Sequence, residues 1–341
     1  MNRIITLLVV SVLTVAFSWQ NLQAKPKHVF KIASLAPEGS VWVNVFEEFT
    51  SEVSEKTNGE VGFRYYPGGI MGDDRAMYRK MKVGQLHGGG FTMAGIAEIV
   101  PDFRVMAIPF LFRSYQEADY VRGKIQPLFK ERFAEKGMQL IAMTEVGFIY
   151  TFSNQPRTTV SDLQQAKTWA PSNDPLTSAF LDSLDISPIT LSIPDVLSSL
   201  QTGLIDTAFN SLYGSIVLQW YVKAPYITDQ PYGYAYGVFI LDKKKFSKLS
   251  ADHQAVIEEV AQKHFPSLIL KTRKSNEDSR SVLSSQGVSF VKTTDDVVQS
   301  LEKHRDITIK NVMGQAFSEE IYQALNSALT EIRSKKDNAA Q

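Results

Sequence analysis

Apolar residues follow two different spacings along the first hundred positions of the chain. Alternating or short continuous apolar runs predict three β-strands, over residues 29–34, 61–66 and 89–93. Between them, apolar residues recur at helical spacing from Val41 to Val53, and Met77 and Met81 mark a second helix. The order β-α-β-α-β predicts a parallel sheet with helices on both faces, which is an α/β fold.

The rest of the chain repeats this alternation of strands and helices. Strands are predicted within 137–146 and over 149–153, 167–171, 189–191, 205–210 and 232–241, and helices over 175–184 and 194–201. A longer helical pattern follows Ser250, and Pro266 is expected to kink or break it. The last helices are expected to start near Thr294 and Ser318.

The first 24 residues have the pattern of a secretory signal. Arg3 precedes an almost unbroken apolar run from Ile4 to Trp19, and Ala24 offers a small residue before a cut. The run is shorter than the roughly 20 apolar residues of a membrane span, and no later stretch is long enough. We therefore expect residues 1–24 to be a cleaved signal peptide and the remaining chain to be exported to the periplasm, not embedded in a membrane.

Composition excludes several classes of protein. The chain has no cysteine, so disulfides, thiolate catalysis and cysteine metal sites are excluded. Acidic and basic residues balance at 36 each, and the only basic block is Lys243 to Lys245, so nothing predicts nucleic-acid binding. The 341 residues are enough for two domains.

Six short motifs, in order along the chain, resemble those of one receptor family. They are Ala36 to Trp42, Tyr66 to Asp74 (similar to "YPGGQLG"), Gly84 to His87 ("G-x-L-D", with His for Asp), Ile108 to Phe112 ("LPFLF"), Asp162 to Pro171 ("DLKGLKIRVP"), and Leu200 to Asp206 followed by Asn210 ("LQTGVVDGQEN"). Each motif is weak alone, but six at plausible spacing are specific. The chain resembles the DctP-type extracytoplasmic solute receptors of TRAP (tripartite ATP-independent periplasmic) transporters.

The resemblance implies a periplasmic binding protein-like fold. Two α/β lobes with mostly parallel sheets would be joined by crossing strands and a long kinked helix, and a small solute would bind between the lobes. The first lobe would comprise residues 25–146 plus about 235–274, and the second about 147–234 plus 275–341. The implied partners are the small and large TRAP membrane subunits, to which the receptor would deliver its solute.

Two positions depart from the family pattern in a way that bears on the solute. Trp169 stands where "DLKGLKIRVP" has the arginine that clamps a solute carboxylate, and Ile149 stands where a second arginine often precedes "TSN". Neither side chain can replace a planar guanidinium in bidentate carboxylate recognition. We therefore expect a neutral, aromatic or hydrophobic solute instead of a simple carboxylate. The alternative for Trp169 is that it packs into the second lobe and fills part of the cleft.

The candidate ligand-binding residues are mostly aromatic or apolar. Asn210 follows a motif whose asparagine often hydrogen-bonds solute, but it could instead cap a turn. The tyrosines of 232–236 lie on one strand face and could line the cleft or pack in the hinge, and Phe148 and Tyr150 lie on the opposite face from Ile149. The full set is Trp169, Asn210, Phe209, Tyr213, Phe148, Tyr150, Ile149, Glu38, Trp42, Phe91, Met93, Tyr234 and Tyr236.

An enzyme is not expected. The chain has no G-x-S-x-G or H-E-x-x-H motif, and Asp73 and Asp74 fit helix capping better than metal binding. We predict no catalytic residues, no metal site and no cofactor. Two other functions stay open at this point: a receptor that feeds a sensor kinase, and an envelope shuttle for hydrophobic molecules.

Overall fold

The computed structural model describes residues 26–339, so the expected signal peptide over residues 1–24 lies outside the described residues. None of the helices within 26–339 combines the length and the hydrophobicity that a bilayer crossing requires.

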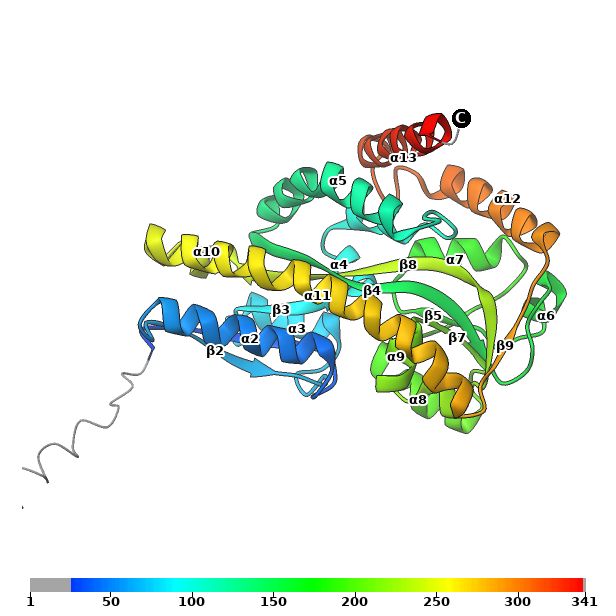
Figure 1. The fold of residues 1–341 in the computed structure, drawn as a ribbon, viewed down its shortest axis with the longest axis horizontal. Coiled ribbons are helices and arrows are strands. Elements are labelled where there is room, and N and C mark those ends of the chain that lie inside the picture. Colours follow the sequence, from blue (N-terminus) through cyan, green and yellow to red (C-terminus); the bar gives the residue numbers. More distant parts are fainter. Residues whose placement is uncertain (1–25, 340–341) are drawn as a thin grey trace, which may run out of the picture.

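A seven-stranded sheet runs through the whole molecule (Figure 1). Its strand order is β2-β1-β3-β8-β4-β7, and β9 also pairs with β8. The strands are β1 (His28–Ser34), β2 (Val61–Tyr66), β3 (Gly88–Thr92), β4 (Met138–Ser153), β7 (Thr207–Asn210), β8 (Tyr226–Asp242) and β9 (Ser289–Val291). The parallel β1, β2 and β3 confirm the predicted β-α-β-α-β start, whereas β8, β4 and β7 add antiparallel pairs, so the sheet is mixed. A second, parallel sheet holds β5 (Trp169–Pro171) and β6 (Ile189–Leu191).

The long strands β4 and β8 cross from one half of the molecule, which holds β1 to β3 and α2 to α4, to the other half, which holds β5 to β7 and α7 to α9 (Figure 1). We predicted separate strands within 137–146 and over 149–153, but β4 is continuous and pairs with β8 along nearly its full length. Its register shifts three times, and one shift lies between Glu145 and Gly147. Gly147 has φ +100°, a conformation that other residues rarely adopt, so the glycine that interrupted the apolar pattern marks a bulge instead of a strand end.

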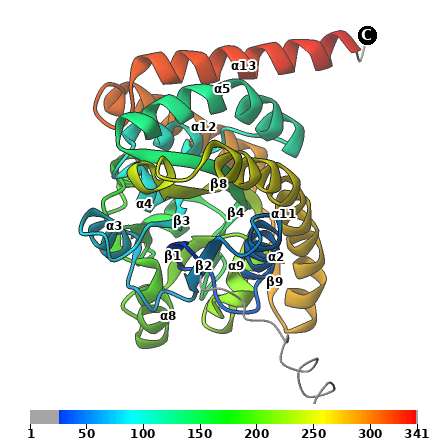
Figure 2. The same cartoon turned by 90° about the vertical axis from the view of Figure 1, so that its left-hand side faces the viewer.

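Helices cover both faces of the sheet. They are α2 (Val41–Lys56), α3 (Asp74–Lys82), α4 (Met93–Ala97), α5 (Tyr115–Glu135), α6 (Val160–Gln164), α7 (Pro175–Asp182), α8 (Ile193–Thr202), α9 (Leu212–Val217), α10 (Lys243–Phe246), α11 (Ala251–Ser285), α12 (Asp295–Val312) and α13 (Glu319–Ala339), with 3₁₀ turns η2 (Pro101–Ala107) and η3 (Trp220–Val222). Asp73 caps α3 by accepting a hydrogen bond from the amide of Ala76 at 2.8 Å, as expected. Figures 1 and 2 show α13 lying along α5, so the end of the expected second-lobe range contacts the expected first lobe.

The 35-residue helix α11 spans both halves and packs on α2, β4 and α9 (Figure 1). Of the two effects expected of Pro266, a kink or a break, the break does not occur, because α11 continues through it. Proline removes one backbone hydrogen bond of a helix. Buried side chains on both sides of Pro266, such as Ile257 and Leu283, hold the two parts against the sheet and against the second half.

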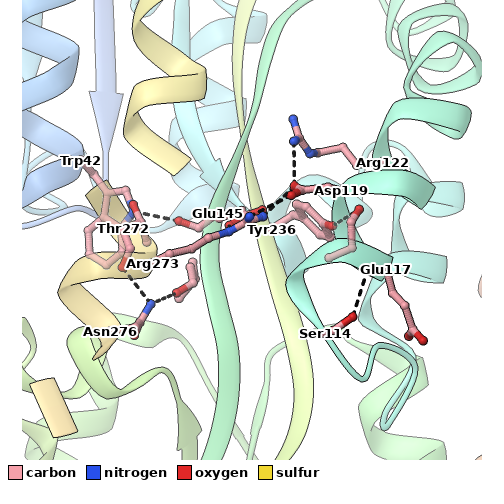
Figure 3. A network of polar contacts seen from close by, with 12 residues as sticks. Trp42, Ser114, Glu117, Asp119, Arg122, Glu145, Tyr236, Thr272, Arg273 and Asn276 are labelled. Atoms are coloured by element: carbon pink, nitrogen blue, oxygen red, sulfur yellow. Dashed lines mark hydrogen bonds and ion pairs between the residues drawn. The ribbon is translucent and has the colours of Figure 1, made fainter. Parts of the chain in front are cut away.

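Arg273 on α11 joins the crossing strand β4 to helix α5 (Figure 3). Its Nε and Nη2 donate to the two carboxylate oxygens of Glu145 at 2.9 and 2.6 Å, and its Nη1 and Nη2 donate to Asp119 at 2.9 and 2.7 Å. The guanidinium carbon lies 4.4 Å from the ring centre of Tyr115. Glu145 has no exposed surface, so its charge depends on Arg273 for compensation.

Asn276, one helical turn beyond Arg273, holds the bulge of β4 to α9. Its Nδ2 donates to the carbonyl of Val146 at 2.9 Å, and its Oδ1 accepts from the amide of Tyr213 at 3.0 Å. A Cβ on Gly147 would lie 2.8 Å from that Nδ2, so a side chain at this position would disturb the contact. The bulge and the helix thus fit each other at the point where the two halves meet.

We predict that Arg273→Met lowers the free energy of unfolding by about 3 kcal/mol, because it leaves the buried Glu145 carboxylate without its cation. The control is Arg280→Met, which removes a more exposed pair with Asp229 and should cost about 1 kcal/mol or less. Urea unfolding of both variants measures the difference. Equal losses of unfolding free energy in the two variants would show that the buried Glu145 carboxylate does not depend on Arg273.

Candidate functional site

A cavity of about 280 Å³ lies between the two halves of the molecule. The β1–α2 loop, β3, α4 and α2 contribute from one side, and β5, β7, α7 and α9 contribute from the other, while β4 and β8 pass along it. Most lining side chains are aromatic or aliphatic. The charged side chains among the lining residues are Arg104, Glu145 and Asp174.

The cavity lining includes every residue of β8 from Tyr232 to Phe239, and the three tyrosines are among them. Tyr236 also serves the fold, because its hydroxyl donates to the carbonyl of Ala118 at 3.0 Å. Burial raises the pKa of Tyr234 and of Tyr236, and the nearby Glu145 carboxylate adds to both shifts. Both phenols are therefore neutral, and the wall that they form carries no phenolate charge.

Trp169 and Ile149, the two positions that lack arginine, both line the cavity. Trp169 also packs into the second half, where its ring lies edge-on to Trp220 with centroids 5.5 Å apart. Its indole N–H donates to the carbonyl of Leu191 at 3.0 Å. Trp169 therefore packs into the second half while it also lines the cavity, and its indole N–H is already used by Leu191.

Asn210 and Phe209 come to the cavity at the end of β7. The Oδ1 of Asn210 accepts from the amide of Ser211 at 2.8 Å, so the residue caps the turn into α9 as well as lining the cavity. A Cβ on Gly214 would lie 2.2 Å from this oxygen, which explains the glycine there. Phe209 stacks on Tyr232 with centroids 4.5 Å apart.

Among the other predicted residues, Trp42, Phe91 and Met93 line the cavity, whereas four do not. Glu38 is exposed, and Phe148 packs behind Tyr234, on the face opposite to Ile149. The structure places these four outside the cavity lining: Glu38, Phe148, Tyr150 and Tyr213.

Tyr213 joins the two halves directly. Its hydroxyl accepts a hydrogen bond from the amide of Val41, the first residue of α2, at 2.9 Å. Its ring lies 5.0 Å from that of Trp42, whose indole N–H donates to the carbonyl of Glu145 at 2.9 Å. Tyr213, which belongs to α9, therefore holds the N-terminus of α2 in place. Its side chain lies beside the cavity and does not line it.

Sequence reasoning missed Arg104 in η2 and its neighbours Asp174 and Thr177 at the start of α7. Arg104 is only 8% exposed, and its Nε lies 3.9 Å from an Asp174 oxygen. Burial lowers the pKa of Arg104, with Asp174 acting in the opposite direction. Arg104 is the single charged residue in the apolar run from Phe103 to Phe112. That pattern could have predicted a buried arginine with a specific role.

A buried carboxyl supports the cavity from behind. Asp74 accepts hydrogen bonds from the amide and the hydroxyl of Thr92 at 3.0 and 2.7 Å, and Thr92 lines the cavity. Burial raises the pKa of Asp74 to about 6, although the bonds from Thr92 act in the opposite direction. Among residues 26–339, no group of three or more histidine, aspartate or glutamate side chains is placed to hold a metal ion.

A sequence model of the family described as "Bacterial extracellular solute-binding protein, family 7" (DctP) matches residues 32–315. The chain belongs to this family. The resemblance found in the six motifs is thus confirmed, and the protein is a solute-binding protein of the TRAP receptor type.

Relatives with known structures share the fold over most of the chain. The sugar acid binding protein DctPAm from Advenella mimigardefordensis, in complex with galactonate, has a TM-score of 0.84 at 20% identity and covers 90% of this chain and 99% of that one. A TRAP periplasmic solute binding protein from Desulfovibrio salexigens with bound orotic acid has a TM-score of 0.82 at 19% identity, with 89% and 99% covered. A solute-binding protein from Roseobacter denitrificans is 26% identical over 308 residues, 88% of this chain and 90% of the relative. The predicted periplasmic binding protein-like fold is therefore confirmed.

We predict that Tyr213→Phe loosens the contact between the two halves, because the amide of Val41 loses its acceptor. One neutral hydrogen bond is worth about 1 kcal/mol, so the Val41 amide should exchange its hydrogen roughly fivefold faster. Hydrogen exchange followed by NMR measures this rate, and Tyr221→Phe is the control. Unchanged protection of Val41 would show that the hydroxyl does not hold the halves together.

The raised pKa of Asp74 predicts a pH dependence of stability. The folded pKa of about 6 exceeds the ordinary value of 3.8, so the folded state holds the proton more tightly than the unfolded state. This contribution to stability is present below pH 4 and is lost as the pH rises towards 6, by about 3 kcal/mol at most. The unfolding free energy of the variant Asp74→Asn should therefore change less between pH 4 and 6 than that of the control Asp73→Asn, which keeps the Asp74 carboxyl. Parallel profiles would contradict the prediction.

Proposed function

We propose that this protein is a periplasmic receptor that captures a neutral, aromatic or hydrophobic small molecule and delivers it to a TRAP-type permease. Family membership supports solute binding and transport. The small and large membrane subunits as partners, the periplasmic location and the absence of catalysis are parts of the proposal that follow from the family.

The observation that carries the solute class is the lining at the two arginine positions. Ile149 and Trp169 both face the cavity, and neither brings a charge to it. The walls beyond them are aromatic and aliphatic, including Phe91, Tyr234 and Tyr236. Burial of apolar ligand surface against such walls supplies roughly 25 cal/mol per Å², so an apolar body gains more here than a hydrated anion does.

The relatives named above were solved with galactonate and orotic acid. Arginine at the two family positions suits carboxylates because the guanidinium fork matches their geometry. In this chain the Glu145 charge is compensated by Arg273, and Arg104 faces Asp174. The cavity lining therefore has no free cation to receive a dicarboxylate.

Capture would proceed by closure of the two halves around the solute. The cavity takes residues from both halves, so a ligand in it contacts both and favours the closed state through its differential affinity. The crossing strands and α11 are the elements that would flex, because they are the long connections between the halves.

Thermal unfolding tests the solute class. Uncharged aromatic compounds at about 100 times their dissociation constant should stabilise the protein by about 2.7 kcal/mol, while succinate or malate should give no shift. Mass spectrometry of molecules released on denaturation of the purified protein provides an independent measurement. Stabilisation by C4-dicarboxylates and none by uncharged aromatic compounds would overturn the proposed solute class.

A further inference from the structure

One corner of the cavity is polar while the remaining walls are largely apolar. We call it the Arg104 corner, and it consists of Arg104, Asp174, Thr177 and Tyr232. Arg104 comes from η2, Asp174 and Thr177 come from the start of α7, and Tyr232 comes from β8. The corner therefore joins segments that are far apart in the sequence at one end of the lining.

Arg104 keeps one buried donor without a partner. Its Nη1 donates to the carbonyl of Ala316 at 3.2 Å, and its Nη2 donates to the carbonyl of Asn173 at 3.4 Å. Among the described residues, its Nε has no hydrogen-bond partner, although the side chain is more than nine-tenths buried. A buried donor of this kind is costly to a folded protein unless something accepts its hydrogen bond.

Asp174 balances the charge of Arg104 without accepting from it. Its Oδ1 lies 3.9 Å from the Nε and accepts from the amide of Leu176 at 3.2 Å, while its Oδ2 accepts from the hydroxyl of Thr177 at 2.5 Å. The distance to Nε is too long for a hydrogen bond. The corner thus keeps an unused donor beside the cavity, and Asp174 balances its charge.

Tyr232 adds a second polar group in the same corner. Its hydroxyl is buried and has no hydrogen-bond partner of suitable geometry within residues 26–339. Stacking on Phe209 and edge contacts with Phe110 and Phe180 fix its ring. Burial raises the pKa of Tyr232 and the Asp174 charge adds to the shift, while the neighbouring Thr177 hydroxyl acts in the opposite direction, so the Tyr232 hydroxyl keeps its proton.

We propose that the ligand has an aromatic or aliphatic body and one uncharged acceptor, of the carbonyl type, that takes hydrogen bonds from the Nε of Arg104 and the hydroxyl of Tyr232. This inference rests on the proposed function, because it assumes that the cavity takes an uncharged solute. A ligand carboxylate in the same place would face the Asp174 carboxylate, and the arginine that could neutralise it already has that counter-ion. A ligand without an acceptor would leave both donors unsatisfied.

Three naphthalenes substituted at the same ring position test the proposal by titration calorimetry at pH 7. Acetylnaphthalene carries an uncharged acceptor, ethylnaphthalene has nearly the same shape without one, and naphthoate carries a negative charge. We expect the full-length mature protein to bind acetylnaphthalene about tenfold more tightly than ethylnaphthalene, and naphthoate more weakly than either.

Substitutions then assign the preference to the corner. Arg104→Met and Tyr232→Phe should each reduce the preference for acetylnaphthalene over ethylnaphthalene, measured as the ratio of the two dissociation constants in the same variant. The control is Arg157→Met, because Arg157 is equally buried and also has an unpartnered Nε, but it does not line this cavity. It should keep the full preference.

The outcomes separate this inference from the proposed function. Equal binding of acetylnaphthalene and ethylnaphthalene would overturn the inference and leave the proposed solute class intact, and this comparison needs no variant to fold. A preference unaffected by both corner substitutions would also overturn the inference. Tightest binding of naphthoate, or binding of none of the three, would overturn the proposed solute class and the inference with it.

Discussion

The bond between Arg273 and Glu145 is the constraint on which the arrangement of this protein depends. Glu145 lies without exposed surface on the strand that passes between the two halves, next to the bulge at Gly147. A carboxylate in such a place needs a cation, and Arg273 supplies it from the helix that also spans both halves. The same helix holds the bulge through Asn276. The bulge of β4 at Gly147 is thereby held by an ion pair and a hydrogen bond, in addition to apolar packing.

The cavity wall keeps the two positions at which the resemblance implies arginine, although their side chains differ. The backbone that carries arginines in the family is kept here, since β4 and β5 still bring residues 149 and 169 to the cavity wall. An indole and a branched aliphatic chain occupy those positions. The indole N–H is used by the carbonyl of Leu191, so the wall is apolar even where a polar atom is present. Polar character is instead found at Arg104, which belongs to a different segment and is balanced by Asp174.

Local pattern and family motifs predicted most of the elements and about half of the aromatic residues that line the cavity. Strand alternation placed Ile149 and Phe148 on opposite faces, and the structure agrees. The motifs could not predict contacts that depend on tertiary distance. Tyr213 lies next to cavity residues in sequence, yet its ring turns to α2, whose position only the folded chain determines. Arg104 was missed for the same reason, since its neighbours Asn173 and Ala316 lie 69 and 212 residues away. The continuous helix through Pro266 reflects packing on both sides that overrides the local effect of proline.

The placement of the indoles has a practical consequence. The chain has four tryptophans, and the three within the described residues, Trp42, Trp169 and Trp220, all line the cavity. The tryptophan emission of residues 26–339 therefore originates from indoles in the cavity lining. The wavelength and intensity of this fluorescence depend on the polarity and contacts of the indole rings. Intrinsic tryptophan fluorescence therefore reports whether the cavity contains water or a ligand.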